Sequence, residues 1–98
     1  MQHRASAQTR AADLLRALGN PLRLAVIVAL AERPCCVHEL VDALDVSQPL
    51  VSQHLRVLRG ARLVATERQG KEIVYTLVDE HVHHIVRDAI RHSEEEPP

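Results

Sequence analysis

The stretch from residue 36 to residue 59 constrains the fold more than any other part of the sequence. Apolar residues follow helical spacing over 36–44, and a second helical pattern begins after Ser47. Ser47 is a favourable N-cap, and Pro49 falls in the first helical turn, where its missing N–H is tolerated. Only a short turn at residues 45 and 46 separates the two patterns. Two short helices joined in this way predict a helix-turn-helix.

Two further helices are predicted ahead of this motif. The first covers about 9–18 and ends at Gly19, a typical helix stop. The second begins at Pro21, in the first helical position, with Asn20 as its cap. Since this second helix is apolar on nearly all sides, we expect it at the buried centre of the domain.

A β-hairpin and a last helix are predicted behind the motif. Residues rich in β-formers occur over 63–66 and 72–78, on either side of a turn at residues 69 and 70 that contains a glycine. Asp79 then caps a helix that runs from Glu80 to about His92. The predicted fold is therefore mainly α with a β-hairpin, in the order α-α-α-α-β-β-α, which is that of a winged helix-turn-helix.

The core of this domain must be built almost entirely from aliphatic side chains. Tyr75 is the only aromatic residue among 98, so Leu, Val, Ile and Ala have to fill the interior. A chain this short buries a modest share of its surface and often needs a partner. Val82, Val86 and Ala89, with Ile85 nearby, form an apolar stripe on the last helix. We therefore expect a homodimer that is joined through its terminal helices.

Charge is divided unequally along a chain whose formal net charge is only −1. Five cationic residues and one acidic residue lie between 47 and 71, whereas two cationic and six acidic residues lie between 79 and 98. A DNA duplex attracts the first region and repels the second. We expect base contacts from the start of the second motif helix and phosphate contacts farther along it and on the hairpin. The predicted base-contacting residues are Gln48, Ser52, Gln53 and His54, and the predicted phosphate-contacting residues are Arg56, Arg68 and Lys71.

The sequence also indicates where the protein acts and how it is divided. The longest apolar stretch, residues 24–31, is far shorter than the ~20 residues that span a bilayer. Residues 1–12 lack the apolar segment of a secretory signal, and two adjacent cysteines do not make a disulfide framework. We expect a cytoplasmic protein without a membrane partner. Its predicted parts are a flexible arm over 1–8, one DNA-binding and dimerisation domain over 9–92, and an acidic tail over 93–98.

The last helix carries a pattern of metal-ligating residues at its two ends. His81 and His92 differ by only about 20° around the helix axis but stand about 16 Å apart along it. A second, antiparallel copy would set Asp79 and His81 of one subunit opposite His92 and Glu95 of the other. Two imidazoles and two carboxylates suit Zn(II), and four protein ligands are typical of a structural or regulatory ion. The ligand types leave Co(II) and Ni(II) open as alternatives.

These residues carry a resemblance to a known family. From about Ala11 to Glu95 the chain resembles the ArsR/SmtB family of bacterial metal-sensing repressors. The matching stretches are LGNPLR at 18–23, CVHEL at 36–40, VSQPLVSQHL at 46–55 and RQG at 68–70. The pattern on the last helix looks like the family's zinc site on its C-terminal helices. The resemblance implies a dimeric winged-helix repressor that binds operator DNA without metal and leaves it when zinc binds.

The sequence departs from this family at the third helix. Many relatives have a second metal site there, built around Cys-Val-Cys with further ligands from the N-terminal arm. Here the stretch reads CVH at 36–38, and the arm offers only His3. Because soft ions prefer more sulfur than this, a site for arsenic or cadmium is poorly supported. Cys35, Cys36 and His38 are candidates for an accessory metal or redox role, and the alternative is that both thiols are small buried hydrophobes.

Two other functional classes compete with a metal-responsive repressor. The protein would be a metal-independent regulator if Cys35 and Cys36 sensed oxidants, in which case changing both to Ser would abolish the response. It would be a small metallohydrolase if His81, His92 and a carboxylate held a catalytic zinc. A hydrolase needs an open coordination position, a general base and a substrate cleft, and the chain is too short to show them. We therefore expect no enzymatic activity and no small-molecule substrate.

Overall fold

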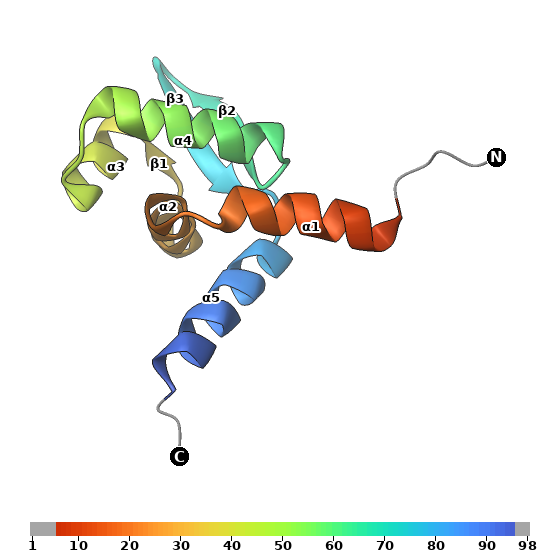
Figure 1. Cartoon of the computed structure of the whole chain (residues 1–98). Coiled ribbons are helices and arrows are strands. Elements are labelled where there is room, and N and C mark those ends of the chain that lie inside the picture. Colours follow the sequence, from red (N-terminus) through yellow and green to blue (C-terminus); the bar gives the residue numbers. More distant parts are fainter. Residues whose placement is uncertain (1–5, 96–98) are drawn as a thin grey trace.

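The computed structural model describes residues 6–95 (Figure 1). Its elements are α1 (Ala7–Leu18), α2 (Pro21–Glu32), β1 (Cys35–Cys36), α3 (Val37–Leu44), α4 (Gln48–Gly60), β2 (Val64–Gln69), β3 (Glu72–Leu77) and α5 (Glu80–Glu94). The order confirms the predicted α-α-α-α-β-β-α arrangement and adds the short strand β1. Residues 1–5 of the expected arm, including His3, and residues 96–98 of the expected tail lie outside the described residues.

Side-chain caps explain where the helices begin. The Asn20 side chain accepts hydrogen bonds from the N–H groups of Leu22 and Arg23 at 2.9 and 3.1 Å, and Pro21 occupies the first position of α2. Ser47 and Asp79 cap α4 and α5 in the same manner, as the sequence predicts. Ser6 also accepts from a backbone N–H in the first turn of α1, at 3.0 Å from Thr9. This cap lets α1 begin at Ala7, two residues earlier than expected.

The three strands form an antiparallel sheet in the order β1-β3-β2. The hairpin pairs Val64 with Leu77 at one end and Gln69 with Glu72 at the other. Its turn therefore lies at residues 70 and 71, one residue later than predicted, and Gly70 adopts the positive φ of 65° that this turn requires. On the other side of β3, Cys35 pairs with Tyr75. A strand of two residues is too short to show an alternation of apolar and polar side chains, so the sequence does not predict β1. This strand forms only because β3 lies beside it.

Helix α2 forms the centre of the core, in line with its apolar sequence. It packs against α3, α4, α5 and β3, and its residues Val26 and Ile27 are fully buried. Around it lie aliphatic side chains from every other major element, including Leu18, Leu40, Val51, Leu55, Leu58, Leu63, Val82 and Val86. One apolar residue of α2 remains at the surface: Val28 is 40% exposed.

Helix α5 lies apart from the helix-turn-helix, whereas α1 contacts α4. In Figure 1, α5 runs from the end of the hairpin past α2 and away from α3 and α4, and its C-terminal end projects beyond the other elements. Among residues 6–95 no single helix is long and apolar enough to cross a bilayer. α1 and α2 meet the length and composition required only as a pair, across a bend of 92°.

Candidate nucleic-acid interface and metal centres

The exposed surface of α4 and the hairpin carries most of the residues predicted to contact DNA. Gln48, Gln53 and Arg56 are exposed along α4, and Ser52 is half-buried. Arg68 and Lys71 are exposed on either side of the hairpin turn. The structure thus presents amide and hydroxyl groups at the start of α4 and guanidinium and ammonium groups beyond them. This is the arrangement that base and phosphate contacts require.

An open pocket of about 520 Å³ lies between α4 and the sheet. Its lining includes Ser52, Arg56 and Arg59 from α4 and Tyr75 from β3. Neither Arg59 nor Tyr75 is among the predicted site residues. Arg59 is one of the five cationic residues counted between 47 and 71. The place of Tyr75, in contrast, depends on the β1-β3-β2 order, which has no local sequence signal.

His54 does not point outward. The prediction that it contacts a base edge is therefore wrong, because its side chain is not accessible to DNA. Its side chain is only 8% exposed and is hydrogen-bonded through Nδ1 to Arg23 Nη1 at 3.2 Å. Burial, together with the positive charge of Arg23, lowers the pKa of His54 below its ordinary value. The sequence did contain the reason: position 54 follows buried Val51 by three residues and precedes buried Leu58 by four, so it shares their face of α4.

The four residues of the α5 pattern form two exposed pairs at the two ends of the helix. Asp79 Oδ1 lies 3.6 Å from His81 Nδ1, and His92 Nδ1 lies 4.0 Å from Glu95 Oε1. Asp79 also accepts hydrogen bonds from the N–H groups of His81 and Val82. Within one chain the structure brings together the members of each pair but not the two pairs. The donor set of each pair, one imidazole nitrogen and one carboxylate, fits half of a zinc site.

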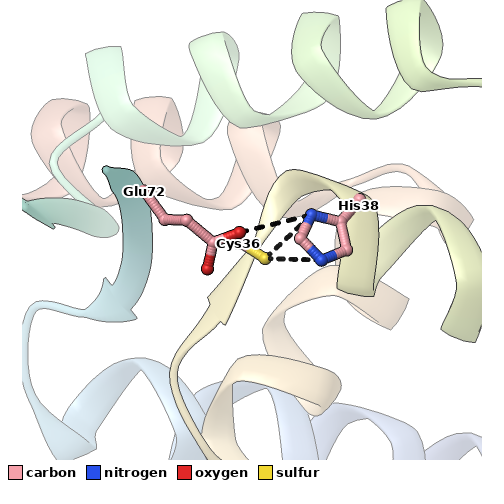
Figure 2. A group of neighbouring side chains, drawn as sticks. All are labelled: Cys36, His38 and Glu72. Atoms are coloured by element: carbon pink, nitrogen blue, oxygen red, sulfur yellow. Dashed lines mark hydrogen bonds and ion pairs between the residues drawn. The ribbon is translucent and has the colours of Figure 1, made fainter. Parts of the chain in front are cut away.

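A second group of ligating atoms lies at the start of α3 (Figure 2). Cys36 Sγ is 3.3 and 3.5 Å from the two ring nitrogens of His38, and His38 Nδ1 is 3.7 Å from Glu72 Oε2. One donor atom from each of the three residues lies within 4.8 Å of the others. Cys36 and His38 were predicted candidates. Glu72 was missed because only the pairing of β1 with β3 brings the first residue of β3 to this place.

The two thiols have different surroundings. Both are buried and neither forms a disulfide. Cys35 Sγ donates to Arg33 O at 3.4 Å, whereas Cys36 Sγ donates to Glu39 Oε1 at 3.2 Å. Burial raises the pKa of both thiols above its ordinary range, and the negative charge of Glu39 adds to this effect. A buried thiol with a raised pKa is a poor nucleophile, which disfavours the thiol-sensor alternative.

The predicted dimer seam on α5 is partly wrong. Val82 and Val86 are buried against the chain's own core, so they are not available to a partner. Instead, exposed apolar side chains come from both terminal helices, with Leu15 of α1 54% exposed and Ile85 of α5 37% exposed. Both line one shallow groove of about 200 Å³ together with Ala89.

Comparison with known proteins assigns this fold to a family. The model of the bacterial regulatory proteins of the arsR family matches residues 20–66. The HTH-type transcriptional repressor SmtB of Mycobacterium tuberculosis is 55% identical over 86 residues, which are 88% of this chain and 64% of that protein. The chain thus spans a little under two thirds of that relative's length.

Solved structures agree with this assignment. The transcriptional repressor BigR of Xylella fastidiosa is 32% identical, with a TM-score of 0.80 over 92% of this chain and 91% of its own. A homodimeric winged helix-turn-helix DNA-binding domain of Mycobacterium bovis, 22% identical, has a TM-score of 0.80 over 98% of this chain and 94% of its own and supports the fold alone. These comparisons confirm the predicted winged helix-turn-helix. The matched family and relatives are transcriptional regulators rather than enzymes.

Proposed function

Because the chain belongs to the arsR family of bacterial regulatory proteins, we propose that it is a metal-responsive transcriptional repressor. In this proposal the apo homodimer binds operator DNA in the cytoplasm and is released when Zn(II) binds between the subunits. The observation that carries the proposal is that two kinds of exposed side chain lie in different parts of this small domain. Cationic and hydrogen-bonding groups gather on α4 and the hairpin, while exposed carboxylate–imidazole pairs occupy both ends of α5.

The DNA contacts are assigned from exposure and chemistry. Gln48, Ser52 and Gln53 would meet base edges in the major groove, since amides and hydroxyls read the hydrogen-bonding pattern there. Arg56, Arg68 and Lys71 would hold phosphates, which supply affinity and register. His54 is left out of this set because it is buried against Arg23. One reading helix covers a half-site, so a symmetric dimer on an inverted repeat is the arrangement we expect.

A homodimer would cover apolar surface that one chain leaves exposed. Leu15, Val28 and Ile85 are each at least 37% exposed on α1, α2 and α5. The chain is also more extended than usual, with a radius of gyration of 14.8 Å against about 13 Å for a compact domain of 100 residues. Both features favour an interface that is built from the terminal helices.

The metal would join the two subunits of this dimer. Asp79 and His81 of one chain would face His92 and Glu95 of the other, which gives two equivalent sites of two nitrogens and two oxygens. Zn(II) suits four such ligands in a tetrahedral site, and Co(II) and Ni(II) are the alternatives that ligand type allows. When bound, the ion would hold the two α5 helices in one relative position.

Regulation then follows from thermodynamic coupling. Zinc must bind the free dimer more tightly than the DNA-bound dimer, and DNA must weaken zinc binding by the same factor. Couplings of about 1–3 kcal/mol, or roughly 5- to 150-fold in affinity, are typical. A change in the angle between two rigid subunits would move both α4 helices away from successive half-sites.

The test measures binding to the DNA upstream of the chain's own gene at fixed salt while zinc is titrated. Zinc should release the wild type but not the His81→Ala variant. His84→Ala is the matched control, because His84 is also exposed on α5 but pairs with Glu80 and Arg87 outside the pattern. The metal-responsive proposal fails if wild type and His81→Ala both bind tightly and ignore zinc.

A further inference from the structure

We propose that Cys36, His38 and Glu72 form a second metal site, complete within one chain, that ties the start of β3, next to the hairpin turn, to the start of α3 (Figure 2). The site would take a borderline divalent ion such as Zn(II) or Co(II). It is independent of the α5 sites, since none of its residues belongs to the terminal helices. It also needs no ligand from the N-terminal arm.

Two of the three distances between donor atoms are close to those around a tetrahedral ion. Zn–S, Zn–N and Zn–O bonds of about 2.3, 2.1 and 2.1 Å place sulfur and nitrogen about 3.6 Å apart, and nitrogen and oxygen about 3.4 Å apart. Here Cys36 Sγ is 3.3 Å from His38 Nδ1, and His38 Nδ1 is 3.7 Å from Glu72 Oε2. These two separations are thus within a few tenths of an ångström of two edges of a tetrahedron, and all three donors lie within 4.8 Å of one another. The fourth corner would be left to water.

The backbone holds one donor rigidly and leaves the other two free to adjust. Cys36 is buried, pairs with Val74 in the sheet, and forms the cap of α3, with its N–H bonded to Glu39 Oε1 at 2.9 Å. The side chains of His38 and Glu72 are 68% and 56% exposed. An ion can thus enter from solvent and draw in the two mobile ligands. On binding, the thiol gives up its proton to solvent and the sulfur becomes a thiolate ligand.

Because of its location, this metal site would affect the position of the hairpin. Glu72 is the first residue of β3 and follows Lys71 at the hairpin turn, whereas Cys36 and His38 belong to the start of the helix-turn-helix. A metal bond between them would restrain the hairpin relative to α3. The ion would thus limit the motion of the segment that carries Arg68 and Lys71.

Co(II) binding tests the proposal in a background with both histidines of the α5 pattern replaced, His81→Ala and His92→Ala. A sulfur ligand produces a thiolate-to-cobalt charge-transfer band, which the sulfur-free α5 sites cannot produce. We expect this band at one equivalent per chain. Cys36→Ser should abolish it. His38→Ala and Glu72→Gln should each weaken Co(II) binding by at least the roughly 10- to 100-fold that losing a partner behind a metal ligand costs, because each removes a ligand itself. Zn(II) should displace the cobalt and slow amide exchange in the hairpin.

Three matched variants keep the experiment decisive. Cys35→Ser should keep the band, because Cys35 Sγ bonds to Arg33 O instead. Glu67→Gln, an exposed carboxylate on the other hairpin strand, should bind cobalt like the background protein. His3→Ala should also have no effect. The proposal is overturned if no thiolate band appears, if His38→Ala and Glu72→Gln bind normally, or if the band is lost in His3→Ala.

Because the readout is cobalt at a thiolate, its outcome is separate from the repressor proposal. Failure of this site would leave zinc release through α5 untouched. Conversely, failure of zinc to release DNA would not remove the cobalt band.

Discussion

Arg23 and His54 are joined by a hydrogen bond of 3.2 Å between Arg23 Nη1 and His54 Nδ1. Arg23 also donates through Nε to Ala17 O, so one guanidinium links the end of α1 to the middle of α4. Since Arg can only donate, His54 Nδ1 must accept, which requires a neutral imidazole. A terminal helix and the proposed reading helix are therefore connected through a residue that can titrate.

The first prediction concerns the pH dependence of stability. The pKa of His54 lies below its ordinary value of 6.5, mainly because the ring is buried and also because Arg23 is positively charged. The unfolded chain then binds this proton more readily than the folded protein does. The stabilisation is complete above pH 6.5 and is lost as the pH falls from there toward the folded-state pKa. Urea unfolding measured between about pH 8 and about pH 5 should show this loss.

Two variants assign that loss to His54. His54→Asn keeps an acceptor near Arg23 but cannot titrate, so it should flatten the decline in this range. His84→Asn removes an exposed histidine and should leave the decline as in the wild type. An unchanged slope in His54→Asn would mean that other groups cause it.

The second prediction separates base contacts from phosphate contacts. Gln53→Ala should reduce discrimination against altered operator positions, by about 1–3 kcal/mol if the amide makes a bidentate contact. Arg68→Ala should instead weaken binding about equally for all sequences and lower the slope of log K against log salt by about 1. Binding titrations at several salt concentrations on matched and mutated operators would measure both effects. Equal losses of sequence discrimination in the two variants would contradict this assignment.

The third prediction concerns the dimer. Leu15 of α1 is 54% exposed, and Leu15→Glu would place a charge there. This variant should shift the protein toward monomer, because burying an unpaired charge in the dimer interface costs free energy. Val57→Glu is the matched control, since Val57 is 39% exposed but belongs to α4 rather than to a terminal helix. Sedimentation equilibrium should show a weaker dimer for Leu15→Glu alone. A dimer that tolerates Leu15→Glu would place the interface elsewhere.

The fourth prediction tests whether the α5 metal sites are shared between subunits. A variant lacking Asp79 and His81 and a variant lacking His92 and Glu95 should each bind no zinc at α5. A mixed dimer of the two would contain one of the two sites, so purified mixed dimer should bind half as much zinc as the wild type. An equal mixture after random subunit exchange should bind about a quarter, because only half of its dimers are mixed. Titration in a Cys36→Ser background keeps the α3 group out of the measurement. No recovery on mixing would mean that each site is formed within one chain.

Local pattern was sufficient to predict most of the fold. The caps at Asn20, Ser47 and Asp79 and the apolar spacing of the helices are short-range features, so they could be read without knowing what packs against them. The prediction that His54 faces outward is wrong. Its polarity suggested an exposed residue, whereas its spacing from Val51 and Leu58 places it on the buried face of α4. Hydrogen bonding to Arg23, 31 residues away, is what makes the burial of that ring tolerable.

What the sequence alone determined is the order of elements, the aliphatic core, the helix-turn-helix and the two carboxylate–imidazole pairs of α5. All of these follow from neighbours within a few residues along the chain. Tertiary structure decided that β1 pairs with β3, that Glu72 meets Cys36 and His38, and that Val82 and Val86 face inward while Leu15 stays exposed. These relationships join residues distant in sequence, and only the packing of the whole chain around α2 specifies them.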